Sequence, residues 1–85
     1  MSWLVYILEC SDQTLYTGVT NDLPRRLSAH ESGQGAKYTK GRGPFTLLYS
    51  EACEDKSAAL KRELAIKSLD RSAKFALIKA EQSKA

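Results

Sequence analysis

Residues 5–18 read VYILECSDQTLYTG, and this stretch decides how the chain folds. The apolar run over residues 3–8 is typical of a strand that is covered on both faces. Residues 14–20 are rich in β-branched side chains and tyrosine, which favours a second strand. Residues 11–13 (SDQ) supply the turn. The sequence therefore predicts an antiparallel hairpin.

Two tyrosines of this hairpin, Tyr6 and Tyr16, have even numbers, as does Gly18. Side chains alternate between the two faces of a strand, so pairing even positions with even positions places all three residues on one face. Because Gly18 has no side chain, it leaves space beside Tyr6. The result is a notch lined by two phenols. Alternatively, the tyrosines merely pack within a hydrophobic hairpin.

The residues after the hairpin predict a first helix that ends near residue 33. Asn21 or Asp22 caps its N-terminus, and Pro24 fits its first turn. The helix presents a face with the spacing i, i+3, i+4, i+7, which carries Leu23, Arg26, Leu27 and His30. The two leucines should dock on the sheet. The arginine in register with the histidine indicates a functional face, whereas a lone histidine would usually be a satisfied, partly buried one.

The second half of the chain predicts one more strand and two more helices. Residues 45–50 form the strand, and residues 51–54 connect it to a helix that Asp55 caps and that runs to about Leu69. Residues 70–72 interrupt the pattern. A short third helix follows, with anchors at Phe75, Leu77 and Ile78. The predicted fold is α+β, a three-stranded antiparallel sheet flanked by about three helices.

The second helix places charged residues where apolar ones are expected. Its apolar arc holds Ala59, Leu60, Leu64 and Ile66, and Glu63 and Lys67 fall inside it. A carboxylate on a core-facing arc is costly unless a cation satisfies it. An intrahelical ion pair with Lys67 is one solution, and a bound metal ion is the other.

Size and composition indicate one small domain over residues 1–85, with residues 81–85 as a polar tail that frays. No apolar run approaches the ~20 residues of a membrane span, and the N-terminal run is too short for a signal peptide. We therefore expect a cytoplasmic protein, a monomer rather than an oligomer, with no membrane contact. Cys10 and Cys53 are expected to be small apolar fillers without a disulfide.

The net charge is +3 and the pI is about 9.0, a modest basic excess. Its distribution is more informative, because basic residues gather in one short region where Glu31 is the only acid. The members are Arg25, Arg26, Lys37, Lys40 and Arg42. Such clusters attract polyanions. A solvated surface with a mild charge bias is the alternative.

Residues 32–44 form a long loop with four glycines. Loops of this length in a compact domain are often functional or mobile. Within it, Lys37-Tyr38-Thr39-Lys40 offers cations, a ring and two hydroxyls, a combination suited to a nucleic-acid backbone and an unstacked base. A flexible connector is the alternative.

Taken in order, these positions resemble the GIY-YIG nuclease domain, in particular its small stand-alone branch, over nearly the whole chain. Residues 5–7 (VYI) and 16–18 (YTG) stand where the family has its two tripeptides; each keeps its tyrosine, and the second keeps its glycine. Arg26 and His30 stand at the helix-borne Arg and His of the family. Glu63 stands at its metal-ligand Glu.

The resemblance implies a divalent-metal-dependent endonuclease that hydrolyses DNA phosphodiester bonds. One ion, Mg²⁺ or Mn²⁺, would be bound by Glu63 on the leaving-group side. Arg26 would clamp the transferring phosphate, and Tyr6 would orient or deprotonate the attacking water. Because an unperturbed tyrosine has a pKa of about 10, that role needs a nearby cation. Tyr16 and His30 would complete the network.

The expected DNA contacts surround this site and are Arg25, Lys37, Tyr38, Lys40, Arg42 and Lys67. The small size leaves no separate recognition domain, which favours low sequence specificity, structure-selective cleavage in DNA repair or recombination, or a protein partner that supplies specificity. One departure from the family is that its late Asn is missing, since the only asparagine is Asn21. Two alternatives therefore stay open, a nucleic-acid-binding module with weak or no catalysis and a protein-interaction module that retains the fold.

Overall fold

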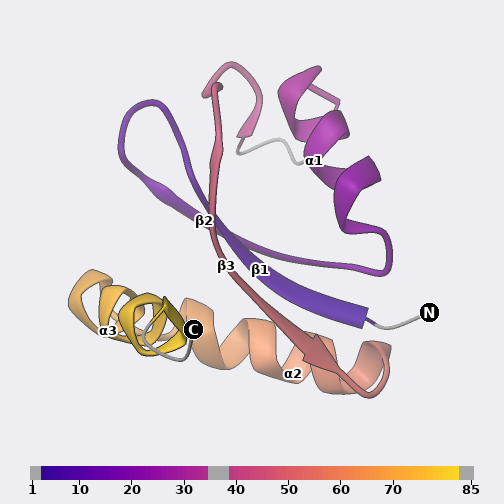
Figure 1. The fold of residues 1–85 in the computed structure, drawn as a ribbon, viewed down its shortest axis with the longest axis vertical. Helices are drawn as coiled ribbons and strands as arrows, with labels where there is room; N and C mark the ends of the chain where they lie inside the picture. Colours follow the sequence, from indigo (N-terminus) through magenta and orange to yellow (C-terminus); the bar gives the residue numbers. More distant parts are fainter. Residues whose placement is uncertain (1–2, 35–38, 83–85) are drawn as a thin grey trace.

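The computed structural model describes residues 3–34 and 39–82 of the chain. In chain order the elements are β1 (Trp3–Glu9), β2 (Leu15–Thr20), α1 (Leu23–Glu31), β3 (Thr46–Cys53), α2 (Lys56–Lys67) and α3 (Arg71–Gln82). The strands form one antiparallel sheet in the order β2-β1-β3. Helix α1 lies on one side of the sheet, and α2 and α3 lie on the other (Figure 1). The predicted α+β fold is confirmed.

The central strand β1 is covered on both faces, as its apolar run predicts. The four residues from Val5 to Leu8 have 0% exposed surface. Val5 and Ile7 belong to the main hydrophobic core, together with residues of β3, α2 and α3. Because side chains alternate along a strand, Tyr6 faces the opposite side, where α1 lies. One strand thus contributes to both layers of the fold.

The hairpin has the register that the sequence predicts. Tyr6 pairs with Gly18, and Leu8 pairs with Tyr16, so both tyrosines and the glycine share one face. The expected open notch over Gly18 is, however, filled. A Cβ built at Gly18 would lie 2.6 Å from Tyr6 Oη and 2.9 Å from Tyr16 Cε2. The missing side chain makes room for the two phenol rings and leaves no open space.

We expect Gly18→Ala to lower the free energy of unfolding by about 1–3 kcal/mol, because an added methyl overpacks a site that the Tyr6 ring already fills. Denaturant unfolding measures the loss. Ser50→Ala is the matched control, because Ser50 pairs with Tyr6 from the other neighbouring strand and its truncation creates no overlap. Equal stability of the two variants would mean that the phenol rings move aside without cost.

Two elements are longer than predicted. Strand β3 continues through residues 51–53, which were expected to be a connection, because these residues pair with residues 3–5 of β1. Helix α3 has 12 residues and runs to Gln82, so it extends into the segment 81–85 for which the sequence predicts a polar tail. Pairing with a distant strand fixes the end of β3, and local composition carries no signal for it.

An aspartate directly precedes each of the three helices and caps its N-terminus. Asp22 rather than Asn21 caps α1, Asp55 caps α2 as predicted, and Asp70 precedes α3. Each carboxylate accepts a hydrogen bond from the backbone N–H three residues later, at 2.8–3.2 Å. Such caps satisfy N–H groups that have no partner within the helix. They fix where the helices start relative to the sheet.

Helix α2 turns a different face to the core than its predicted apolar arc. It buries Ala59 and Ile66, whereas Leu60 and Leu64 are 39% and 67% exposed, so the predicted arc is wrong for these two leucines. The Glu63 side chain is only 15% exposed. Its carboxylate therefore lies on the buried side of α2. For Glu63, the sequence prediction of a core-facing position is thus confirmed.

A bridge of polar groups joins β3 to α2. The Tyr49 hydroxyl donates to Glu51 Oε1 at 2.6 Å, and Arg62 Nε donates to Glu51 Oε2 at 3.0 Å.

Cys10 and Cys53 are free thiols, the first buried and the second half-buried. None of the helices within residues 3–34 and 39–82 combines the length and apolar character needed to cross a membrane.

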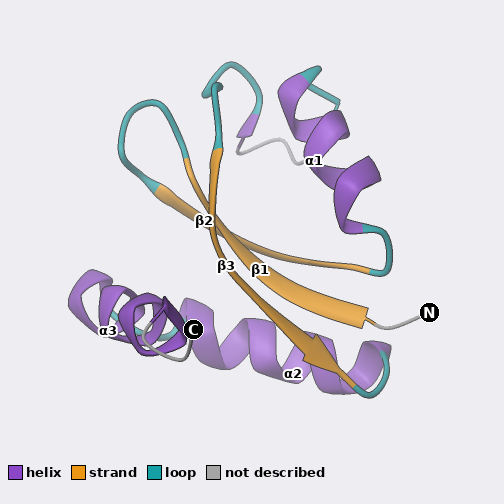
Figure 2. Ribbon diagram, viewed as in Figure 1, coloured by secondary structure: helices purple, strands orange, loops and turns teal. Residues whose placement is uncertain are grey.

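The loop before β3 docks on the turn of the hairpin, and both lie at the same end of the sheet (Figure 2). The Ser11 backbone N–H donates to the Arg42 carbonyl oxygen at 2.8 Å, and the Arg42 guanidinium forms an ion pair with Asp12. This docking positions residues 39–45 beside the site. Lys37 and Tyr38 lie outside the described residues.

Candidate active site

Tyr6 is the centre of a buried cluster between the sheet and α1. Its hydroxyl oxygen lies 2.8 Å from His30 Nε2, and Arg26 Nε donates to it at 3.4 Å. On the far side of the imidazole, His30 Nδ1 lies 2.8 Å from Thr39 Oγ1. One strand, one helix and one loop thus meet through hydrogen bonds.

Tyr16 completes this cluster from β2. Its ring centroid lies 5.3 Å from that of His30 and 6.3 Å from that of Tyr6. The exposures differ, because Tyr6 and His30 are 0% and 1% exposed, whereas Tyr16 and Arg26 are half-buried. The phenol and imidazole expected in a cleft therefore lie beneath the surface, and Tyr16 and Arg26 lie above them.

The donor and the acceptor of each hydrogen bond in the cluster can be assigned. An arginine can only donate, so the Tyr6 oxygen accepts from Arg26 and its own proton is directed to His30 Nε2. Burial, followed by the nearby charge of Arg26, lowers the pKa of His30. The imidazole is therefore neutral at pH 7, and we assign the Nδ1 proton to the bond with Thr39.

The phenol of Tyr6 is also uncharged in this arrangement. Burial raises the pKa of Tyr6, and the hydrogen bond from Arg26 opposes this only in part. The cation that phenolate formation requires is thus in place, but in the closed cluster desolvation outweighs it. Deprotonation of Tyr6 therefore has to accompany opening of the cluster or transfer of its proton to His30.

We expect the His30 imidazole to titrate below its ordinary pKa of 6.5. Because the folded pKa is the lower one, the unfolded chain binds the proton first. Stability is then full above about pH 6.5 and is lost as the pH falls toward the folded pKa. His30 is the only histidine, so its ring signals in an NMR titration are unambiguous. A midpoint at or above 6.5 would contradict a buried neutral imidazole.

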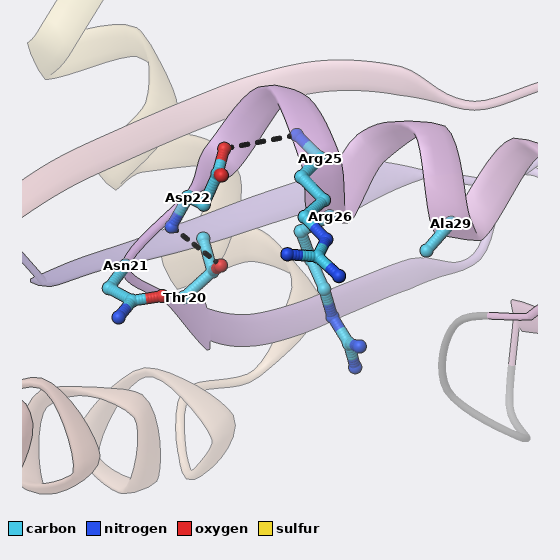
Figure 3. A pocket seen from close by; sticks show the side chains of 6 residues that line it. All are labelled: Thr20, Asn21, Asp22, Arg25, Arg26 and Ala29. Atoms are coloured by element: carbon cyan, nitrogen blue, oxygen red, sulfur yellow. Dashed lines mark hydrogen bonds between the residues drawn. The ribbon is translucent and has the colours of Figure 1, made fainter.

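Arg26 also lines a surface cavity of about 380 Å³ at the start of α1. The lining residues are Thr20, Asn21, Asp22, Arg25, Arg26 and Ala29. Figure 3 shows the Arg25 and Arg26 guanidinium groups extending from the first turn of α1 toward the same side. Two cations at one cavity favour an anionic ligand, and one of them touches Tyr6.

Glu63 approaches from the opposite layer of the fold. In the described part of the chain its ion-pair partner is Lys67, with Nζ 3.6 Å from Oε2. This is the intrahelical i,i+4 ion pair that the sequence offered as one of two alternatives. Burial is the main reason for the raised pKa of Tyr6, and the negative charge of Glu63 adds to it. Glu63 is therefore near enough to influence the phenol electrostatically, but it is not hydrogen-bonded into the cluster as described.

The donor groups near the cluster fit a weakly held, hydrated metal ion. Among residues 3–34 and 39–82, no three His, Cys, Asp or Glu side chains gather as a metal site, which does not suit the three or four protein ligands of zinc. One carboxylate, Glu63, suits Mg²⁺, an ion that keeps several of its waters. Lys67 is 49% exposed, so its ammonium can leave the carboxylate for solvent.

The remaining predicted contacts are spread around the site. Arg25 lines the cavity beside Arg26, Lys40 is exposed in the docked loop, and the charge of Arg42 is offset by Asp12. Thr39 is 1% exposed and hydrogen-bonded to His30, a contact that the sequence did not predict. A threonine in a glycine-rich loop carries no local sign that it will reach a buried imidazole.

The order ββαβαα, with two hairpin tyrosines gathered against an arginine and a histidine of the first helix, defines the GIY-YIG type of catalytic domain. The model of the family described as the GIY-YIG catalytic domain matches residues 2–76. The chain belongs to this family.

The match extends over most of the length of each of the following three relatives. The UPF0213 protein OB0043 of Oceanobacillus iheyensis is 54% identical over 78 residues, which are 92% of this chain and 91% of the relative. The solution NMR structure of the UPF0213 protein BH0048 from Bacillus halodurans is 48% identical, with a TM-score of 0.61 over 94% of this chain and 85% of that one. The solution structure of EF2693 from E. faecalis is 35% identical, with a TM-score of 0.65 over 96% and 88%. These names state no reaction.

Proposed function

We propose that this domain is a divalent-metal-dependent endonuclease that hydrolyses DNA phosphodiester bonds with low sequence specificity. The observation that carries the proposal is the position of Arg26. Its guanidinium lines a cavity with Arg25 and donates a hydrogen bond to Tyr6. It therefore joins a place for a phosphate to a phenol–imidazole pair that can move a proton.

In the proposed reaction, Arg26 binds the scissile phosphate and neutralises the charge that builds on its oxygens. Because Tyr6 has 0% exposed surface, water reaches its hydroxyl only when the covering side chains shift. The phosphate supplies that shift by drawing the guanidinium of Arg26 toward the cavity. Binding of the substrate thus uncovers the residue that acts on water.

Tyr6 and His30 would then handle the proton of the attacking water. The Tyr6 oxygen takes the proton from water while the Tyr6 hydroxyl proton passes to His30 Nε2, so that hydroxide forms and His30 becomes cationic. The low pKa of His30, due first to burial, keeps the imidazole neutral and ready to accept. Thr39 holds the ring through Nδ1, which leaves Nε2 facing the phenol.

Glu63 would hold the metal ion, after its ion pair with Lys67 is released. A bound divalent ion supplies positive charge that stabilises the leaving oxygen. We further propose a cytoplasmic, monomeric protein that acts on branched or otherwise distorted DNA in repair or recombination. A domain of 85 residues has little surface for reading a sequence, so a protein partner would add specificity.

The test is a cleavage assay on single-stranded, duplex and branched DNA, with magnesium and with a chelator, using Glu63→Gln as the control variant. Magnesium-dependent cleavage that the control lacks supports the proposal. Binding without cleavage would identify a nucleic-acid-binding module instead. Neither binding nor cleavage would favour a protein-interaction module.

A further inference from the structure

A second cavity borders β2, the edge strand that carries Tyr16. It has a volume of about 250 Å³ and is lined by Leu15, Tyr16, Thr17, Lys67 and Lys74. Neighbouring side chains of a strand point to opposite faces, so Tyr16 lies on the α1 side of the sheet and Leu15 and Thr17 on the side of α2 and α3. The cavity therefore wraps around the edge of the sheet.

The charged groups of this cavity come from two helices, and their sum is positive. Lys67 of α2 forms an ion pair with Glu63, with Nζ 3.6 Å from Oε2. Lys74 of α3 is half-buried and has no ion-pair partner in the described part of the chain. An ammonium that is partly removed from water without a partner carbonyl or carboxylate favours an anion beside it.

Tyr16 connects this cavity to the proposed active site. The same ring that lines the cavity lies 5.3 Å from the His30 ring. The pKa of Arg26 is raised first by its hydrogen bond with Tyr6, and the Tyr16 hydroxyl contributes to the same rise. The two lysines are thus separated from the phosphate-facing arginine by one aromatic side chain.

We propose that Lys67 and Lys74 form a subsite for a second, non-scissile phosphate of the same nucleic-acid strand, next to the phosphate held by Arg26. The subsite rests on the proposed function. A strand carries a negative charge at every nucleotide, and the half-buried Tyr16 ring between the two positions offers a surface on which a base can stack. The substrate is therefore an oligonucleotide that occupies both positions, and a lone phosphodiester is too small.

The test is metal-free binding of a labelled single-stranded oligonucleotide, measured as a function of salt for the wild type, Lys67→Gln, Lys74→Gln and the double variant. Each single substitution should weaken binding by about threefold to tenfold and reduce the slope of log affinity against log salt by about 0.7, as expected for one lost phosphate contact. The double variant should lose about 1.4 of that slope.

Lys61→Gln is the matched control, because it removes the same charge from an exposed position of α2 that does not line the cavity. It should leave the slope within error of the wild type. If Lys61→Gln and Lys74→Gln weaken binding equally, or if neither does, the subsite is overturned. Unchanged melting temperatures of all variants confirm that folding is not the cause.

Failure of the subsite is distinguishable from failure of the proposed function. A wild type that cleaves DNA while Lys74→Gln behaves as Lys61→Gln overturns the subsite alone. A wild type that binds but never cleaves removes the endonuclease activity, and the salt slopes still decide the subsite. A wild type that binds no oligonucleotide overturns both.

Discussion

Arg26→Ala should slow single-turnover cleavage by about 10³-fold or more while weakening DNA binding far less. An arginine that meets developing phosphoryl charge contributes mainly to the transition state, and this guanidinium both lines the cavity and touches Tyr6. Rate and affinity must be measured in the same variant, with DNA saturating in the rate experiment.

Arg25→Ala is the matched control for this result. Arg25 is the preceding residue, is exposed and lines the same cavity, whereas the hydrogen bond to Tyr6 comes from Arg26. We expect its loss to weaken binding and to leave the bound-state rate nearly unchanged. If Arg26→Ala shows this same pattern, Arg26 only positions DNA and the role proposed for it is wrong.

Glu63→Gln should reduce cleavage to background and abolish magnesium dependence, because it removes the charge that we propose holds the ion and keeps nearly the same shape. The fold should survive, since no cavity opens. Affinity for DNA without metal should hold or rise, because a negative charge near the phosphate is gone. Magnesium titration and thermal melting of this one variant measure all three effects.

The competing explanation is that Glu63 serves only Lys67. That pair joins a carboxylate with 15% exposure to an ammonium with 49% exposure, and such a pair contributes at most about 0.5 kcal/mol. Lys67→Met breaks the pair from the other side and keeps the carboxylate, so it should retain magnesium dependence at saturating DNA. A Glu63→Gln protein that cleaves with unaltered magnesium dependence would end the metal-ligand hypothesis.

Local patterns in the sequence were sufficient for the parts of the site that depend on one hairpin and one helix. Parity along two strands predicted that Tyr6 and Tyr16 share a face, because alternation is a property of every strand. Helical spacing predicted that Arg26 and His30 point the same way. In both cases neighbours in the sequence determine the geometry.

The parts that could not be predicted depend on contacts between distant segments. Thr39 reaches His30 because its loop docks on the hairpin turn, and no pattern around Thr39 contains that docking. The exposure of Leu64 follows from the rotation of α2 about its axis, which packing against the sheet decides. Lys74 lines the same cavity as Tyr16 only because α3 packs back against the sheet, and an isolated lysine on a helix carries no sign of this.

The burial of α1 has a consequence for local stability. Of its nine residues, all of which the structure describes, His30 is the buried one, whereas β1 is buried along its centre. Segments with few buried contacts open at a small fraction of the free energy of global unfolding. Arg26 and His30 can therefore leave Tyr6 while the sheet stays intact. Assembly of the proposed catalytic groups is then an equilibrium of its own, and a DNA phosphate that draws Arg26 toward the cavity shifts it toward the open state while the sheet stays folded.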